Sequence, residues 1–214
     1  MTEERFTTPY PGYDVLEKWR TPSWNDQTRA VIAKRLHEVP PRRFFTELQW
    51  ATLEAVCHRV VPQPERLHPV PIAPWIDAKL HKGQGSGTRY AGLPRDRDCW
   101  RRGMDAIEAE AQHRFRRSYH ELDQAEQDII LHAMKEDEVG APNWKDLPAK
   151  KFMRHVLLRE IVAIYYAHPA AWSEIGFGGP ASPRGYVRMG FNRRDPWEAQ
   201  EEQTELAVRK VVGR

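Results

Sequence analysis

The sequence is poor in the features that define several common classes of protein. Its 214 residues include only two cysteines, Cys57 and Cys99, so the chain carries no disulfide framework. No stretch approaches the roughly 18 apolar residues that a membrane-spanning helix needs. The opening MTEERFTTPYPGY lacks the layout of an export signal. We therefore expect no membrane span and a cytoplasmic chain, periplasmic only if it is exported with another chain.

The sequence also lacks a charge excess of either sign. Its 33 basic and 30 acidic residues are mixed along the chain and leave a net charge of +3. A nucleic-acid-binding protein would favour a concentrated basic face. We therefore expect no nucleic acid partner.

Ligand spacing typical of metal sites and of nucleophilic catalysis is missing as well. No two of the histidines are four positions apart, the spacing that places two ligands on one helix face. Cys57 and Cys99 lack CxxC spacing and a nearby histidine–carboxylate pattern, and His58 beside Cys57 points to another side of the predicted helix. Each cysteine is therefore predicted to be a small buried residue, with pairing to a partner chain as the alternative. A self-contained metal-binding domain would use His113, His120 and His168. That alternative stays open, as does a helical adaptor unrelated to redox chemistry.

Helical periodicity, by contrast, runs through most of the sequence. Two helix starts carry the spacing of a capping box, Thr46 with Gln49 and Asp123 with Glu126. Gly140 is expected to end the helix that begins at Asp123. The apolar positions and breakers predict helices over residues 26–38, 46–61, 74–81, 94–117, 123–140, 149–167 and 195–211.

These patterns predict a mainly α protein, a single helical-bundle domain with long irregular segments rich in Pro and Gly. We expect an extended arm over 1–25, a helical domain over 26–167, an interface segment over 168–194 and a C-terminal helix over 195–214. Pro74 is expected at the first position of its helix. The 149–167 helix is apolar on more than one face, so we predict it to be the central helix, buried on most sides. The arm, which is rich in Pro and aromatic residues, is expected to pack on the body of the chain or on a partner.

The segment that follows the 149–167 helix combines glycine, proline and large aromatic residues. Its GFGGP stretch is neither a phosphate loop nor a dinucleotide fingerprint, so no cofactor site is predicted in it. Aromatic residues and arginine carry much of the binding energy in protein interfaces, although a satellite core under a loop is an equal alternative. The predicted contact residues are Tyr165, Tyr166, His168, Pro169, Trp172, Phe177, Pro180, Arg184 and Tyr186.

The order of motifs along the chain resembles the gluconate 2-dehydrogenase subunit 3 family. The motifs are FFTELQWATLEAVCHRVVPQ (44–63), WID (75–77), YAGL (90–93), HELD (120–123) with Gln127, YYAHP (165–169) after Phe152, and GFGGPASPRGY (176–186). The early motifs are individually weak, whereas the last is specific to the family and the ordered set supports the resemblance. Relatives with a twin-arginine export signal differ from this sequence, which lacks one.

The resemblance implies an accessory role. Members of the family are small subunits that bind and stabilise a large flavin-containing dehydrogenase of the glucose–methanol–choline type, which oxidises a sugar or glycoside. A cytochrome is often the third member of the complex. The resemblance further implies that FAD is held by the partner and that this chain has no catalytic residues, cofactor or metal of its own.

Overall fold

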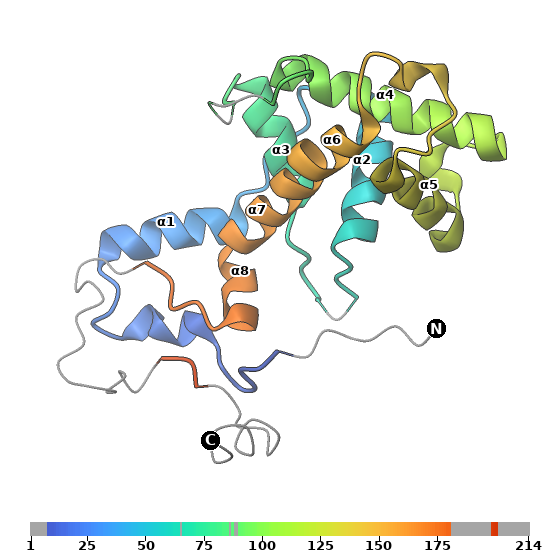
Figure 1. Ribbon diagram of the computed structural model, residues 1–214. Coiled ribbons are helices and arrows are strands. Elements are labelled where there is room, and N and C mark those ends of the chain that lie inside the picture. Colours follow the sequence, from blue (N-terminus) through green and yellow to red (C-terminus); the bar gives the residue numbers. More distant parts are fainter. Residues whose placement is uncertain (1–7, 65, 86, 88–89, 181–197, 201–214) are drawn as a thin grey trace, which may run out of the picture. The chain divides into compact units, whose positions relative to one another are not determined.

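The computed structural model describes residues 8–64, 66–85, 87, 90–180 and 198–200 (Figure 1). The regular elements among these residues are all helical, which confirms the mainly α prediction. The chain groups into two compact units. We name Val39–Tyr165 the helical unit, and we name the residues up to Glu38 together with those from Tyr166 onward the terminal unit. The helix predicted over 26–38 therefore groups with the N-terminal arm and the segment after Tyr165, and not with the helices between residues 39 and 165.

The helical unit is built around α2 (Glu47–Val60), which contacts α3 (Ile72–His81), α4 (Asp96–Phe115) and α5 (Gln124–Glu136). A longer helical stretch follows, consisting of α6 (Ala149–Phe152), a π-helical turn over Met153–Leu158, and α7 (Arg159–Ala167). Figure 1 shows α4 as the longest helix of this unit. The fully buried core residues include Leu53, Val56, Ile76, Met104, Ile107, Ile130, Met134, Leu147, Phe152 and Leu157.

Both predicted capping boxes are confirmed. The Thr46 hydroxyl accepts a hydrogen bond from the Gln49 amide at 3.3 Å, and the Gln49 side chain accepts one from the Thr46 amide at 3.2 Å. At the start of α5, Asp123 and Glu126 make the same reciprocal pair at 2.9 and 3.1 Å. Each box satisfies two amides that the first helical turn would otherwise leave unbonded.

Several predicted helix ends are wrong. Pro74 is the third residue of α3, because that helix begins at Ile72. The helix that starts after Asp123 ends at Glu136 and not at Gly140, because Asp137 adopts a left-handed conformation with φ of 67° and stops the helix. Of the helix predicted over 195–211, residues 198–200 are not helical, and the other residues lie outside the described part of the chain.

The prediction that the 149–167 helix is buried on most sides is also wrong. Val162 is 42% exposed, and one stripe of side chains at helical spacing faces the core. The stripe consists of Phe152, Met153, Leu157, Ile161 and Tyr165. The central position belongs to α2, which contacts three other helices of the unit.

A buried carboxylate fixes the turn after α5. Glu110 on α4 is fully buried and accepts hydrogen bonds from the amides of Gly140 at 3.0 Å and Ala141 at 2.8 Å, and from Nε of Arg114 at 2.6 Å. Burial alone would raise the pKa of this carboxyl, but the hydrogen bonds from Ala141, Arg114 and Gly140 outweigh it and lower the pKa below its usual range. The charged form of Glu110 therefore holds the 138–141 turn against α4.

Candidate interaction site

The terminal unit has a small apolar core of its own, assembled from both ends of the chain. It contains a 3-10 helix over Val15–Arg20, α1 (Asp26–His37), α8 (Pro169–Trp172) and a 3-10 turn over Ser173–Ile175. The 3-10 helix over Val15–Arg20 and α1 both contact α8 (Figure 1). Its buried core residues are Val15, Trp24, Ile32 and Trp172. Tyr13, Leu16, Trp19 and Leu36 pack around them.

The N-terminal arm is fastened to the C-terminal segment by hydrogen bonds. Nζ of Lys18 donates to the carbonyl oxygen of Gly178 at 2.9 Å, across 160 positions of sequence. The amide of Val15 donates to the Ser173 hydroxyl at 3.1 Å. The arm therefore packs on the C-terminal segment of its own chain. Sequence reasoning missed Lys18, because a lysine in a polar segment carries no signal of a contact so distant in sequence.

Two glycines of the GFGGP stretch make room for aromatic rings. Gly176 and Gly179 both have positive φ, at 63° and 74°. A Cβ atom at Gly176 would lie 2.6 Å from the Tyr10 ring, and one at Gly179 would lie 3.0 Å from Trp24 and 3.2 Å from Trp172. These glycines permit close packing and a left-handed backbone.

Several predicted contact residues turn inward. Tyr165, His168, Pro169 and Trp172 are buried. His168 caps α8, with Nδ1 accepting from the Ala170 amide at 3.3 Å. Trp172 packs in the terminal core, and its indole N–H donates to the Tyr166 carbonyl at 2.9 Å. For Trp172 the structure favours the core alternative over the interface one.

Other predicted contact residues face solvent. Tyr166 is 36% exposed and Phe177 is 41% exposed, and the Phe177 ring stands edge-on to Trp172 with centroids 5.3 Å apart. Ile175, which the sequence did not single out, lies in the same segment and is 43% exposed. Pro180 is half-buried, and Arg184 and Tyr186 lie outside the described residues.

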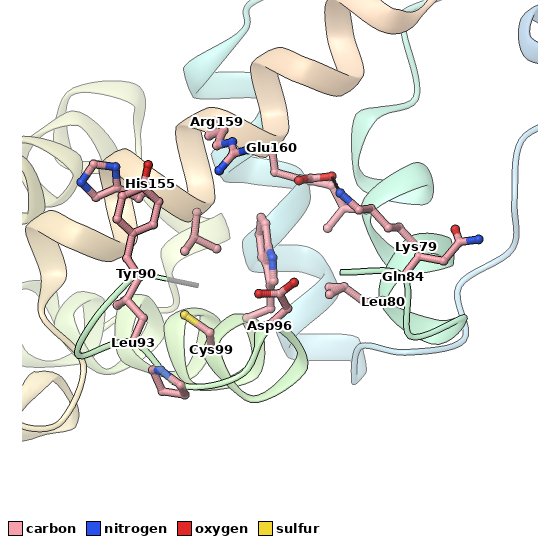
Figure 2. Close-up of a pocket in the computed structure, with 14 residues that line it drawn as sticks. Lys79, Leu80, Gln84, Tyr90, Leu93, Asp96, Cys99, His155, Arg159 and Glu160 are labelled. Carbon is pink, nitrogen blue, oxygen red and sulfur yellow. Dashed lines mark hydrogen bonds and ion pairs between the residues drawn. The ribbon is translucent and has the colours of Figure 1, made fainter. Parts of the chain in front are cut away.

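The helical unit contains a separate cleft between α3, α4 and the π-helical turn (Figure 2). It encloses about 560 Å³, part of it open to solvent. One wall carries an ion pair between Nζ of Lys79 and Oε1 of Glu160 at 2.5 Å. Another carries Tyr90 stacked on His155, with centroids 3.9 Å apart. The two charges of this ion pair match each other, and Arg159 lines the cleft beside Glu160.

The thiols are poor nucleophiles. Both cysteines are buried and unbonded to each other. Burial, helped by the charge of Glu54, raises the pKa of Cys57. Burial and the charge of Asp96 raise the pKa of Cys99, which lines the cleft, to about 11. Both groups are therefore protonated at neutral pH, and a protonated thiol neither attacks carbonyls nor binds metals well.

The described residues also bring no metal-ligand set together. No group of three or more His, Cys, Asp and Glu side chains among them is arranged to hold a metal ion. His113 lies in the last turn of α4 and His120 in the short 3-10 helix that follows, whereas His168 caps α8 in the terminal unit. No described helix is both long and apolar enough to cross a bilayer.

Comparison with known proteins identifies a family. A sequence model described as gluconate 2-dehydrogenase subunit 3 matches residues 47–179. The matched stretch begins at the first residue of α2 and ends at Gly179, which packs against Trp24 and Trp172. No curated protein and no solved structure matches the chain.

Proposed function

Because the chain belongs to the gluconate 2-dehydrogenase subunit 3 family, we propose that it is a non-catalytic subunit of a dehydrogenase complex. Its partner is a large FAD-containing subunit of the glucose–methanol–choline type, which oxidises a sugar or glycoside. This chain binds and stabilises that subunit, and the FAD belongs to the partner. A cytochrome as electron acceptor and a cytoplasmic location are further parts of the proposal.

The observation that carries the proposal is the exposed apolar row of the terminal unit. Tyr166, Ile175 and Phe177 hold large apolar side chains in solvent within a short segment. The backbone around them is fixed by the Trp172 indole and by the bonds from Lys18 and Val15. Exposed aromatic side chains on an ordered backbone lose little conformational entropy on binding, which is typical of interface anchors.

The thiols and histidines of the described residues support an accessory role over a catalytic one. The thiols are buried and protonated, and the ion pair in the cleft is internally matched. Catalysis of acyl transfer or hydrolysis would need a nucleophile, a base within hydrogen-bond reach and a group that stabilises developing charge. Cys57 and Cys99 do not supply the nucleophile, because burial keeps both thiols protonated.

Co-expression tests the proposal. A tagged copy of this chain would be expressed with a flavin-dependent dehydrogenase of the glucose–methanol–choline type from the same organism, and affinity purification should recover both proteins together with the flavin absorbance. An unrelated flavoprotein of the same type serves as the control partner. A monodisperse single chain that recovers no flavoprotein, and whose presence changes neither the yield nor the activity of the dehydrogenase, would contradict the proposal.

A further inference from the structure

Two arginines of α4 are stacked on one phenylalanine ring. The guanidinium carbons of Arg97 and Arg101 lie 5.2 and 4.3 Å from the centroid of the Phe44 ring. Both arginines are exposed, while Phe44 is only 7% exposed. These cation–π contacts hold both guanidiniums over the ring without using their N–H donors, which can still bind a ligand.

The ring beneath them is held firmly by a buried carboxylate. Asp77 on α3 is fully buried and accepts hydrogen bonds from the amides of Arg43, Phe44 and Phe45, at 2.7, 2.9 and 3.0 Å. Phe44 also meets Phe45 edge-on, with ring centroids 4.8 Å apart. Because the platform is fixed from two sides, the guanidiniums lose less freedom when they bind a ligand than free arginine side chains would.

The positive charges of Arg97 and Arg101 form no ion pair with any residue that the structure describes. Arg97 and Arg101 are one helical turn apart, so their like charges repel. Neither guanidinium has a hydrogen bond or ion pair to any residue that the structure describes. Arg97 also stands in the first turn of α4, where the helix dipole disfavours a positive charge. This arrangement costs stability within the chain, which favours a role in binding.

A hollow beside the stacked pair widens the basic surface. It is lined by Arg95, Arg97 and Arg101, with Asp96 and Asp98 between them. A nucleic acid would bring an unbroken row of phosphates against these two carboxylates. A protein surface can place its carboxylates at the arginines alone, and the planar guanidinium fork matches a carboxylate in two parallel hydrogen bonds. The interleaved charges therefore favour an acidic protein surface over a polyphosphate.

We propose that Arg97 and Arg101, stacked on Phe44, form a docking point for an acidic surface of the flavoprotein subunit. The identity of this partner rests on the proposed function. The docking point is separate from the apolar row of the terminal unit, and it adds charge-based selection of the partner and faster association.

Binding measured between purified chain and flavoprotein tests the docking point. The double variant Arg97→Glu/Arg101→Glu should bind roughly tenfold to a hundredfold more weakly at ~0.1 M salt, mainly through slower association. The difference in affinity between this variant and the wild type should shrink at ~1 M salt, where the Debye length falls to about 3 Å. Arg97→Lys/Arg101→Lys keeps both charges but loses the planar guanidinium groups. Its affinity for the flavoprotein should therefore lie between that of the wild type and that of the glutamate variant.

A matched control separates the docking point from general electrostatics. Lys135→Glu/Lys145→Glu makes the same change of net charge at exposed positions of the helical unit outside the hollow. It should bind nearly as well as the wild type. The Arg97→Glu/Arg101→Glu chain keeps a like-charge pair and loses both contacts with Phe44, so a thermal melt must show that it is folded before its affinity is compared.

Each remaining outcome decides against the docking point. If the arginine variant and the lysine control lose affinity equally, or if neither does, the proposal is wrong while the accessory-subunit function stands. If the wild type binds no flavoprotein, both proposals fail together. If it instead binds a single-stranded oligonucleotide tightly and only through these arginines, the surface is a phosphate site and the acidic-surface proposal is overturned.

Discussion

Lys18 and Gly178 are joined by a hydrogen bond of 2.9 Å, although 160 positions of sequence separate them. The lysine is only 5% exposed, so its ammonium group is largely removed from water. A buried cation is stable only where acceptors replace its hydration, and the Gly178 carbonyl is one of them. The contact therefore links the N-terminal arm to the segment that carries the exposed apolar row.

Replacing Lys18 by methionine should loosen the terminal unit. Lys18→Met keeps the length of the side chain but removes the donor, so the Gly178 carbonyl loses its bond. We expect the free energy of unfolding to fall by about 1–3 kcal/mol, measured by urea denaturation. Lys34→Met is the control, because Lys34 is exposed and makes only a 3.6 Å pair with Glu38. Equal effects of the two substitutions would contradict a special role for Lys18.

Trp172 and Phe177 are adjacent aromatics that should behave differently on substitution. Trp172→Ala removes a buried core side chain and should cost about 3–5 kcal/mol of stability. Phe177→Ala removes an exposed ring, so the chain should melt almost as the wild type does. If Phe177 anchors the partner, its loss should weaken the complex by about 2 kcal/mol, roughly 30-fold in affinity. Thermal melts of the single chain and titration of the flavoprotein separate these effects.

Glu110 should make the stability of the chain depend on acid pH. Its pKa in the folded chain is lower than the ordinary value of 4.5, so its stabilising effect is fully present above that value. The effect is lost as the pH falls through the folded pKa. Glu110→Gln should lower the free energy of unfolding by about 3 kcal/mol at pH 7.

Urea midpoints measured across the acid range check this sign. The gap in the free energy of unfolding between wild type and Glu110→Gln should narrow as the pH falls below 4.5, because Glu110 then becomes neutral, as the glutamine is at every pH. Glu136→Gln is the control, since its side chain is 51% exposed and pairs only with Lys135 at 3.4 Å. A gap that stays constant down to pH 3 or widens on acidification would show that the charge of Glu110 is not the stabilising feature.

The two thiols should resist modification in the folded chain. Cys57 and Cys99 are buried and their pKa values are raised, so few thiolates exist at neutral pH. We expect a thiol-specific colour reagent to react at least roughly a hundredfold more slowly with the native chain than with the chain in urea. Rapid reaction of one thiol in the native chain would reopen the possibility that it pairs with a partner.

Local signals in the sequence predicted local structure well. The capping boxes at Thr46 and Asp123 depend on residues three positions apart, and both form as predicted. Asp137 ends α5 before Gly140, because an aspartate in the left-handed conformation can also stop a helix. Aspartate adopts this conformation less readily than glycine does, so the sequence did not indicate this helix end. The family resemblance carried the functional prediction, and the family match supports it.

The contacts that define the site could not be predicted in the same way. The sequence shows that the 149–167 helix has apolar residues on several faces, but only packing decides that Ile161 is buried and Val162 is 42% exposed. The position of Trp172 in the terminal core depends on Val15 and Trp24, far away in sequence. Arg97 and Arg101 looked like ordinary surface charges until the structure placed Phe44 beneath both of them.

The terminal unit is assembled from both ends of the chain, and this limits the order in which the chain can fold as it is synthesised. Val15 and Ser173, which hydrogen bond in that unit, are 158 positions apart, and the whole helical unit lies between them in sequence. Domains tend to fold as they emerge, N-terminal parts first. Val15, Trp24 and Ile32 must therefore leave the ribosome long before Trp172 exists to cover them. The helical unit can fold first, and the apolar side chains of the arm stay exposed to solvent until the C-terminal segment has been synthesised.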